Sequence, residues 1–118
     1  MGDSRAIIVD KNLKVHQLSR DHKPDCLDER KRIDECGGRV KQFLNKQTGK
    51  EVGPARVWLK DHEIPGLAMS RSLGDYVAQS VGVIPDPEII FYDIQIDDRV
   101  IIIASDGVWE FLSNEKAA

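Results

Sequence analysis

One acidic residue stands where a sheet could present a hard oxygen ligand to a cation. Asp106 lies one residue beyond the apolar run Val100 to Ala104, after Ser105, and precedes Gly107. A carboxylate placed just after a buried strand lies at the rim of its sheet, where a metal ion can reach its oxygens. The alternative is that Asp106 caps the turn formed by residues 108–110. Its position alone does not separate these two interpretations.

Two further carboxylates could join Asp106. Glu110 lies four residues later, so a helix beginning near Gly107 would bring the two acidic groups together at its N-terminal end. Such a pair is costly unless the two groups share a cation or a proton. Asp3 adjoins Gly2 at the start of a predicted strand, although an aspartate in a turn is the more common explanation for it.

Other combinations of metal-binding or charged residues give weaker signals. We expect reduced thiols and no zinc site, because no zinc motif matches the spacing of His16, His22, Cys26 and Cys36. We place His22 in a surface loop.

Basic residues also have a plain interpretation. Arg71 lies four residues before Asp75, which favours an ion pair between the two over a contact with a phosphate group. Residues 30–32, with the sequence Arg-Lys-Arg, are interpreted as the solvated side of a helix rather than as a binding patch.

The composition excludes several classes of partner. The chain has 118 residues, with 20 Asp and Glu against 17 Lys and Arg, for a formal net charge of -3. This balance gives no bulk attraction to nucleic acid or to an anionic membrane. No run approaches the ~20 apolar residues of a membrane-spanning helix, and no apolar segment near the N-terminus marks a secretory signal. We therefore expect an intracellular protein, cytoplasmic or alternatively nuclear, with no nucleic-acid partner and no membrane segment.

The first third of the chain predicts a hairpin and a helix. Residues 5–9 and 13–18 are rich in Ile, Val and Leu and flank the turn residues 10–12. A helix is predicted over residues 26–36, with Asp25 as its N-cap and two glycines as its stop.

The remaining elements follow from composition and periodicity. Residues 39–66 mix short apolar stretches with Gly and Pro, which indicates an irregular excursion of low stability. A helical segment is expected within residues 67–79. Alternating apolar residues predict a half-buried strand over residues 89–96, and the uniformly apolar run 100–104 predicts a strand that is buried on both faces and paired with it.

Five segments of the sequence carry a further signal when they are taken in order. They are Gly2-Asp3-Ser4-Arg5-Ala6, Leu18-Ser19-Arg20-Asp21-His22-Lys23-Pro24, Glu29 with Arg32-Ile33 and Gly37-Gly38-Arg39-Val40, Leu67-Ala68-Met69-Ser70-Arg71-Ser72-Leu73-Gly74-Asp75, and Ala104-Ser105-Asp106-Gly107-Val108-Trp109-Glu110. In this order, and covering nearly the whole chain, they resemble the metal-dependent protein Ser/Thr phosphatases of the PP2C type. A complete domain of that family is roughly twice as long or more, so the resemblance implies that residues 1–118 are its central portion.

The resemblance implies a fold and a chemistry. The fold would be α+β, an incomplete part of a two-sheet antiparallel β-sandwich flanked by helices, with residues 41–66 as a flap associated with substrate choice and possibly with substrate binding. Two or more Mn²⁺ or Mg²⁺ ions would activate a water that hydrolyses phosphoserine or phosphothreonine in phosphoprotein substrates, without a phosphoenzyme. Asp106 would bind the core metal centre, while Asp3 and Glu110 would match a further, weaker metal site. Many relatives have Asp at the position of Glu110.

The resemblance also implies active-site motifs that this sequence does not contain. The Asp-Gly-His-Gly-Gly motif with its general-acid histidine, the upstream phosphate-binding arginine and the later Asp-Asn motif have no counterpart here, and no catalytic residue is identifiable in this chain. We therefore expect activity in a longer parent protein and none in the isolated chain, which would expose sheet edges and self-associate. The alternative is a catalytically dead, phosphatase-like module that binds phosphoproteins or acts as an adaptor.

Overall fold

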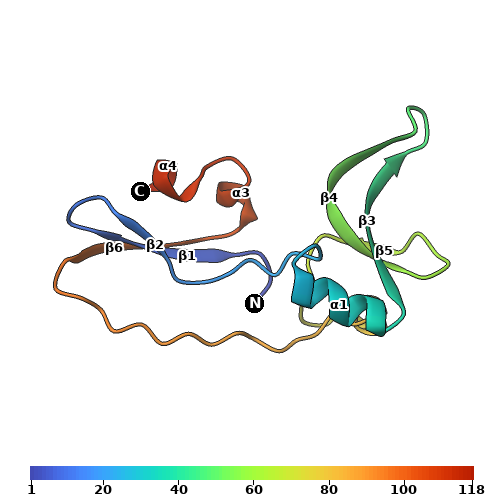
Figure 1. Cartoon of the computed structure of the whole chain (residues 1–118), viewed down its shortest axis with the longest axis horizontal. Coiled ribbons are helices and arrows are strands. Elements are labelled where there is room, and N and C mark those ends of the chain that lie inside the picture. Colours follow the sequence, from blue (N-terminus) through green and yellow to red (C-terminus); the bar gives the residue numbers. More distant parts are fainter. The chain divides into compact units, whose positions relative to one another are not determined.

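The computed structural model describes all 118 residues, Met1 to Ala118 (Figure 1). The chain forms two compact units. Unit 1 comprises residues 1–2 and 22–87, and unit 2 comprises residues 3–21 and 88–118. No helix in either unit has the length and apolar character needed to cross a membrane.

Unit 2 is built on a three-stranded antiparallel sheet with the strand order β2-β1-β6. Its strands are β1 (Arg5–Asp10), β2 (Val15–Gln17) and β6 (Asp98–Ala104), and its helices are α3 (Asp106–Trp109) and α4 (Asn114–Ala117). The predicted hairpin is confirmed. An Asp10 carboxylate oxygen closes its turn by accepting hydrogen bonds from the backbone N–H groups of Asn12 and Lys14, at 2.8 and 2.9 Å. Ile7, Val9 and Trp109 form the buried core of this unit.

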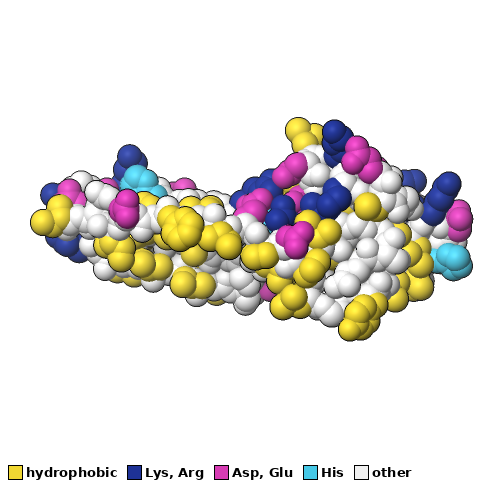
Figure 2. All heavy atoms as spheres, turned by 90° about the horizontal axis from the view of Figure 1, so that it is seen from below, with side chains coloured by type: hydrophobic (Ala, Val, Ile, Leu, Met, Phe, Trp, Pro, Cys, Tyr) yellow, Lys and Arg dark blue, Asp and Glu magenta, His cyan; other side chains and the backbone are white.

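The C-terminal strands differ from the prediction in three ways. Residues 89–95 form neither strand nor helix, and β6 pairs with β1 instead. β6 is also not buried on both faces, because 75% of Ile103 and 49% of Ile101 are exposed. Periodicity shows which side chains of a strand would share a face, but a strand also needs a neighbour to accept its backbone hydrogen bonds. Nothing in these 118 residues supplies that neighbour, and hydrophobic side chains stand exposed along this part of the chain (Figure 2).

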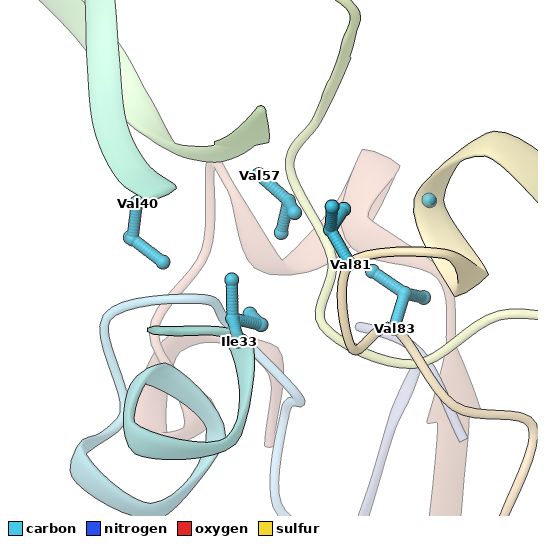
Figure 3. Packing of buried hydrophobic residues seen from close by; sticks show 6 residues of the cluster. Ile33, Val40, Val57, Val81 and Val83 are labelled. Carbon is cyan, nitrogen blue, oxygen red and sulfur yellow. The ribbon is translucent and has the colours of Figure 1, made fainter. Parts of the chain in front are cut away.

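Unit 1 places two helices against a second three-stranded antiparallel sheet, with the strand order β3-β4-β5. Its strands are β3 (Gly38–Asn45), β4 (Lys50–Leu59) and β5 (Pro65–Leu67), and its helices are α1 (Leu27–Glu35) and α2 (Tyr76–Gln79). The two antiparallel sheets and short helices confirm the α+β class. Ile33 points from α1 into a cluster that includes the valines labelled in Figure 3, and it is fully buried there.

The ends of α1 are close to the predicted ones. Cys26 rather than Asp25 occupies the N-cap position, and its side chain makes no capping hydrogen bond. The chain leaves the helix through Gly37, whose φ of +80° suits glycine.

The prediction of an irregular excursion over residues 39–66 is wrong, because most of the segment is regular sheet. The glycines and proline that suggested a loop have specific places in the β3–β4 hairpin. Gly49 takes the positive φ of the hairpin turn. Gly53 and Pro54 are extra residues in a β-bulge, since Gln42 pairs with Ala55 while the next residue, Phe43, pairs with Val52.

The predicted helix within residues 67–79 is confirmed only at its end. The four-residue α2 begins after Asp75, whose Oδ1 accepts a hydrogen bond from Ala78 N at 3.0 Å. Before it, Arg71 forms an isolated parallel bridge with Ile84, so residues 71–75 are not helical and Arg71 does not pair with Asp75.

Arg71 instead binds a carboxylate buried in α1. Glu29 is fully buried, and its Oε1 accepts a hydrogen bond from Arg71 Nη2 at 2.6 Å. Its Oε2 accepts from Arg32 Nη2 and from Ser70 Oγ, both at 2.6 Å. Arg32 is therefore not part of a solvated side of the helix, in contrast to the prediction. We call Glu29 with these three partners the Glu29 node.

The two arginines of the Glu29 node also donate hydrogen bonds to backbone oxygens of other segments. Arg32 Nε donates to Gly82 O at 2.8 Å, and Arg71 Nη1 donates to Asp86 O at 3.0 Å. His22 is bonded to a member of the node through the backbone, because Ser70 N donates to His22 O at 2.9 Å. His22 is only 2% exposed, so its predicted place in a surface loop is wrong.

Charge and burial oppose each other in setting the pKa of Glu29. Burial would raise this pKa, but the hydrogen bonds from Arg32, Arg71 and Ser70 outweigh burial and hold the pKa well below its usual range. A carboxyl whose pKa is lowered on folding stabilises the fold above the ordinary glutamate pKa of about 4.3. That contribution is lost as the pH falls below this value.

We expect Glu29→Gln to destabilise the chain by about 3 kcal/mol at neutral pH, because it removes the buried carboxylate that Arg32 and Arg71 both bind. Urea unfolding at pH 7 measures this loss. The matched control is Glu35→Gln on the same helix, which removes only an exposed pair with Lys31 at 3.8 Å and is expected to cost less than about 0.5 kcal/mol. The gap between wild type and Glu29→Gln should narrow below pH 4, and equal losses for the two variants would contradict the role of the node.

A second expectation concerns the contact between Gly66 and Trp58. Gly66 has a φ of +72°, and a Cβ there would lie 2.9 Å from the Trp58 ring. Gly49 has a similar φ of +66°, but a Cβ there would meet nothing within 4 Å. Both alanine substitutions strain the backbone by about 1 kcal/mol. Gly66→Ala should therefore lower the free energy of unfolding by about 1–3 kcal/mol more than Gly49→Ala, and equal losses would show that the ring contact is unimportant.

Candidate metal-binding site

Two of the three predicted metal ligands lie at the same end of the unit 2 sheet. β1 and β6 are antiparallel, and Arg5 at the start of β1 pairs with Ala104 at the end of β6. Asp3 lies two residues before Arg5, and Asp106 lies two residues after Ala104. The chain therefore brings Asp3 and Asp106 to the same end of the sheet, where β1 begins and β6 ends.

The surroundings of Asp106 leave its carboxylate available. Asp106 is the first residue of α3, and Ser105 occupies the N-cap position. The alternative that Asp106 caps this turn is therefore not what the structure shows. Its side chain is half-buried and forms no hydrogen bond or ion pair within the chain. A half-buried carboxylate without an internal partner is suited to accept a cation.

Glu110 is joined to Asp106 through the backbone. The predicted helix near Gly107 is present as a single turn, and Glu110 N donates to Asp106 O at 2.8 Å. The Glu110 side chain is exposed. The carboxylate oxygens of Asp3, Asp106 and Glu110 do not all come within 4.8 Å of one another. The structure thus gathers the three acids at one end of the sheet without forming a compact set of ligands from them.

Arg5 fixes the backbone on which these acids are placed. Its Nε and Nη2 each donate to one carboxylate oxygen of Asp21 at 2.8 Å, which is the two-pronged geometry that guanidinium groups favour. This hydrogen bonding to Asp21 raises the pKa of Arg5. The third nitrogen, Nη1, donates to Asn114 Oδ1 at 2.6 Å. The guanidinium therefore links β1 to the loop after β2 and to the start of α4.

Trp109 connects the same arginine to α3. The guanidinium carbon of Arg5 lies 5.2 Å from the centroid of the Trp109 ring, within the range of a cation–π contact. Trp109 Nε1 donates to Ala104 O at 2.8 Å, which ties the helix to the end of β6. Trp109 directly precedes Glu110, and Arg5 lies two residues after Asp3. Arg5 and Trp109 therefore hold the backbone segments that carry the candidate ligands.

Local pattern analysis missed these positioning residues. Arg5, Asp21 and Trp109 entered the prediction only as members of the segments that carry the family resemblance. Arg5 lies 16 residues from Asp21 and 109 residues from Asn114, and no periodicity links residues so distant. The only signal that could have found them was their occurrence inside those segments.

The predicted flap, residues 41–66, lies in unit 1 and forms most of the β3–β4 hairpin. Its core-facing side borders a hollow of about 520 Å³, lined by Val40, Ala55 and Pro54 together with Arg30 and Asp25 near α1. A smaller hollow of about 220 Å³ is lined by residues that include Arg39, Lys41, Phe43, Trp58 and Glu63. Lys41, Gln42 and Glu51 line both hollows, so the two share part of their lining on the hairpin.

Comparison with known proteins identifies a family that matches the whole chain. Residues 1–118 match the family described as Protein phosphatase 2C. The chain is 43% identical over 125 residues to a rice protein (Oryza sativa subsp. japonica) named probable protein phosphatase 2C 48, covering 99% of this chain and 34% of that protein. It is 42% identical over 122 residues to probable protein phosphatase 2C 61 of Arabidopsis thaliana, covering 100% of this chain and 36% of that protein. The chain thus spans about a third of the length of these curated relatives.

Solved structures show the same relationship. A serine-threonine phosphatase 2C from Toxoplasma gondii matches with a TM-score of 0.81 and 30% sequence identity, covering 99% of this chain and 39% of that one. A C. elegans sex determining protein matches with a TM-score of 0.74 and 26% identity, covering 98% of this chain and 24% of that one. The fold and the sequence therefore agree, and the chain belongs to the protein phosphatase 2C family.

Proposed function

We propose that this chain supplies part of the active site of a metal-dependent protein phosphatase acting on phosphoserine and phosphothreonine in proteins. The observation that carries the proposal is Asp106, a half-buried carboxylate without an internal partner, at the same sheet end as Asp3. It occurs in a chain whose whole length matches Protein phosphatase 2C.

The donor groups fit the proposed cofactor, Mn²⁺ or Mg²⁺. All three candidate ligands are carboxylates, the hard oxygen donors that these ions prefer. Such ions supply a hydroxide nucleophile at neutral pH when they are bound. Asp106 would bind the core centre, and Asp3 and Glu110 would serve a further site. Arg5 and Trp109 would hold the backbone segments of these ligands in place, and residues 41–66 would form the substrate flap.

We propose further that the isolated 118-residue chain has no phosphatase activity. Asp3, Asp106 and Glu110 do not gather within 4.8 Å in it, so these residues alone present no compact metal site. The exposed position of Glu110 also favours a second candidate function, a phosphatase-like module that binds phosphoproteins without hydrolysing them. Metal-dependent hydrolysis of a phosphopeptide by the full-length protein distinguishes the two functions.

In the full-length protein, we expect Asp106→Asn to lower the metal-dependent rate of phosphopeptide hydrolysis at least about a hundredfold, because the amide cannot supply the negative charge of the ligand. Asp3→Asn and Glu110→Gln should have smaller effects, which higher Mn²⁺ concentrations relieve. Asp61→Asn, at an exposed turn between β4 and β5, is the control and should leave the rate unchanged. An unchanged rate in Asp106→Asn would contradict the assigned ligand, and robust turnover by the isolated chain would contradict its proposed inactivity.

The chain taken alone should also self-associate. β6 has a neighbour on one side only, and Val100, Ile101 and Ile103 are each about half exposed or more. Apolar edge strands of this kind pair with other chains. Ile103→Lys should shift the sedimentation of the isolated chain toward the monomer, whereas Leu13→Lys, at an exposed turn residue, should not. A monodisperse wild-type monomer would contradict this expectation.

A further inference from the structure

Charge is distributed unevenly between the unit 1 sheet and the rest of the chain. Residues 38–67, which contain β3, β4 and β5, hold six Lys and Arg but only three Asp and Glu. The chain as a whole carries a formal net charge of -3. The sheet is therefore a basic region within an acidic protein, and it attracts anionic groups locally although the bulk charge does not.

Three of these cations lie on one face of the β3–β4 hairpin. Arg39 pairs with Trp58, and Lys41 pairs with Arg56, in the antiparallel register. Directly opposed residues point to the same side of a sheet, and β3 places its buried Val40 on the other side, toward the core. We call the side with Arg39, Lys41, Arg56 and Trp58 the outer face of the hairpin.

The cations of the outer face have no carboxylate partners. Arg39 donates only to backbone oxygens, those of Leu59 at 2.9 Å and His62 at 3.1 Å. Arg56 donates to Gly66 O at 2.6 Å. Lys41 is exposed, and its side chain makes no hydrogen bond or ion pair. The two guanidinium groups are thus held in place by neutral backbone acceptors, and neither forms an ion pair with a carboxylate.

The outer face also has an apolar component. Phe43 is 48% exposed and pairs with Val52 beyond the bulge. Together with Arg39, Lys41 and Trp58 it lines the hollow of about 220 Å³. Trp58 forms a fixed part of this lining, because its Nε1 donates to Lys41 O at 2.9 Å and its ring packs on Gly66. Glu51 and Glu63 are the acidic members of the lining, and Glu63 forms an exposed ion pair with Lys46 at 3.3 Å.

We propose that the outer face of the β3–β4 hairpin docks an acidic protein segment that carries an apolar side chain. Acidic residues of that segment pair with Arg39, Lys41 and Arg56, and the apolar side chain enters the hollow beside Phe43 and Trp58. A nucleic acid is the less favoured occupant, because the net charge of -3 on the chain opposes a densely charged polyanion. The identification of this segment with a phosphoprotein substrate rests on the proposed function, whereas docking itself requires neither metal nor hydrolysis.

Fluorescence anisotropy with a labelled peptide tests the docking directly. The probe is a decapeptide of Asp, Glu and Ser with one central Leu, and it contains no phosphate. It should bind the 118-residue chain, and the affinity should fall as salt is raised. Replacing the central Leu of the probe by Ser should weaken binding, and replacing its acids by Lys should abolish it. A single-stranded oligonucleotide that binds more tightly than the peptide would overturn the proposal.

Variants locate the binding to the outer face. Lys41→Glu should weaken peptide binding at least about fivefold. The control Lys60→Glu makes the same charge change at an exposed turn of the same sheet and should change affinity less than about twofold. Equal losses for the two variants would overturn the proposal, because they would show an effect of net charge alone.

Two further variants separate docking from misfolding. Glu63→Gln removes one of the two acids that line the hollow and should tighten binding, a gain that a damaged fold cannot produce. Phe43→Ser should weaken binding of the Leu peptide but not of the Ser peptide. A failure of Glu63→Gln to tighten binding would count against the hollow as the site. Because the assay contains no metal and no phosphate, its failure leaves the proposed hydrolysis by the full-length protein standing.

Discussion

Unit 1 depends on one charge that is fully removed from solvent. A carboxylate in the position of Glu29 is tolerated only when other groups replace the hydrogen bonds that water would have made. Arg32 on the same helix provides one, and Ser70 and Arg71, 41 and 42 residues away, provide others. Because both arginines also bind backbone oxygens farther along the chain, a single acidic group holds α1 against two distant segments. The core around Ile33 adds burial, but the ion pairs specify which segment lies against the helix.

In unit 2 a positively charged side chain, Arg5, joins several segments. Arg5 binds Asp21 and Asn114 and lies against Trp109, so one cation joins β1 to both C-terminal helices and to the loop after β2. The segments that make the family recognisable are thus partners of one another. The first contacts the second and the fifth through Arg5, and the third contacts the fourth through Glu29. Much of what is recognisable in this sequence is therefore structural, and the candidate ligands Asp3 and Asp106 lie close in sequence to Arg5 and Trp109 within unit 2.

The sequence predicted the helices and hairpins that are determined by neighbouring residues in the chain. The β1–β2 hairpin follows from its turn residues, and α1 follows from acidic residues in its first turn and glycine at its end. The placement of Asp106 at the end of β6 was predictable for the same reason.

The pairing of residues far apart in the chain could not be predicted from local signals. Arg71 was expected to bind Asp75 as a helical neighbour, but the helix begins only at Tyr76, and the stronger partner lay 42 residues earlier. The alternation of residues 89–96 likewise could not reveal that no neighbouring strand is available in the chain. The three acids were found as residues, but how far apart their oxygens lie depends on tertiary structure.

The β-bulge at Gly53 and Pro54 divides the β3–β4 hairpin into two parts that can change independently. On one side of it Val40 and Val57 are paired and buried in the core, and on the other side Phe43 and Val52 are paired near the exposed tip. Since the bulge already absorbs a mismatch of register, residues inserted or removed at the tip need not displace Val40 from Val57. In such a hairpin, evolution can alter the reach and chemistry of the tip while the part that folds against α1 keeps its register.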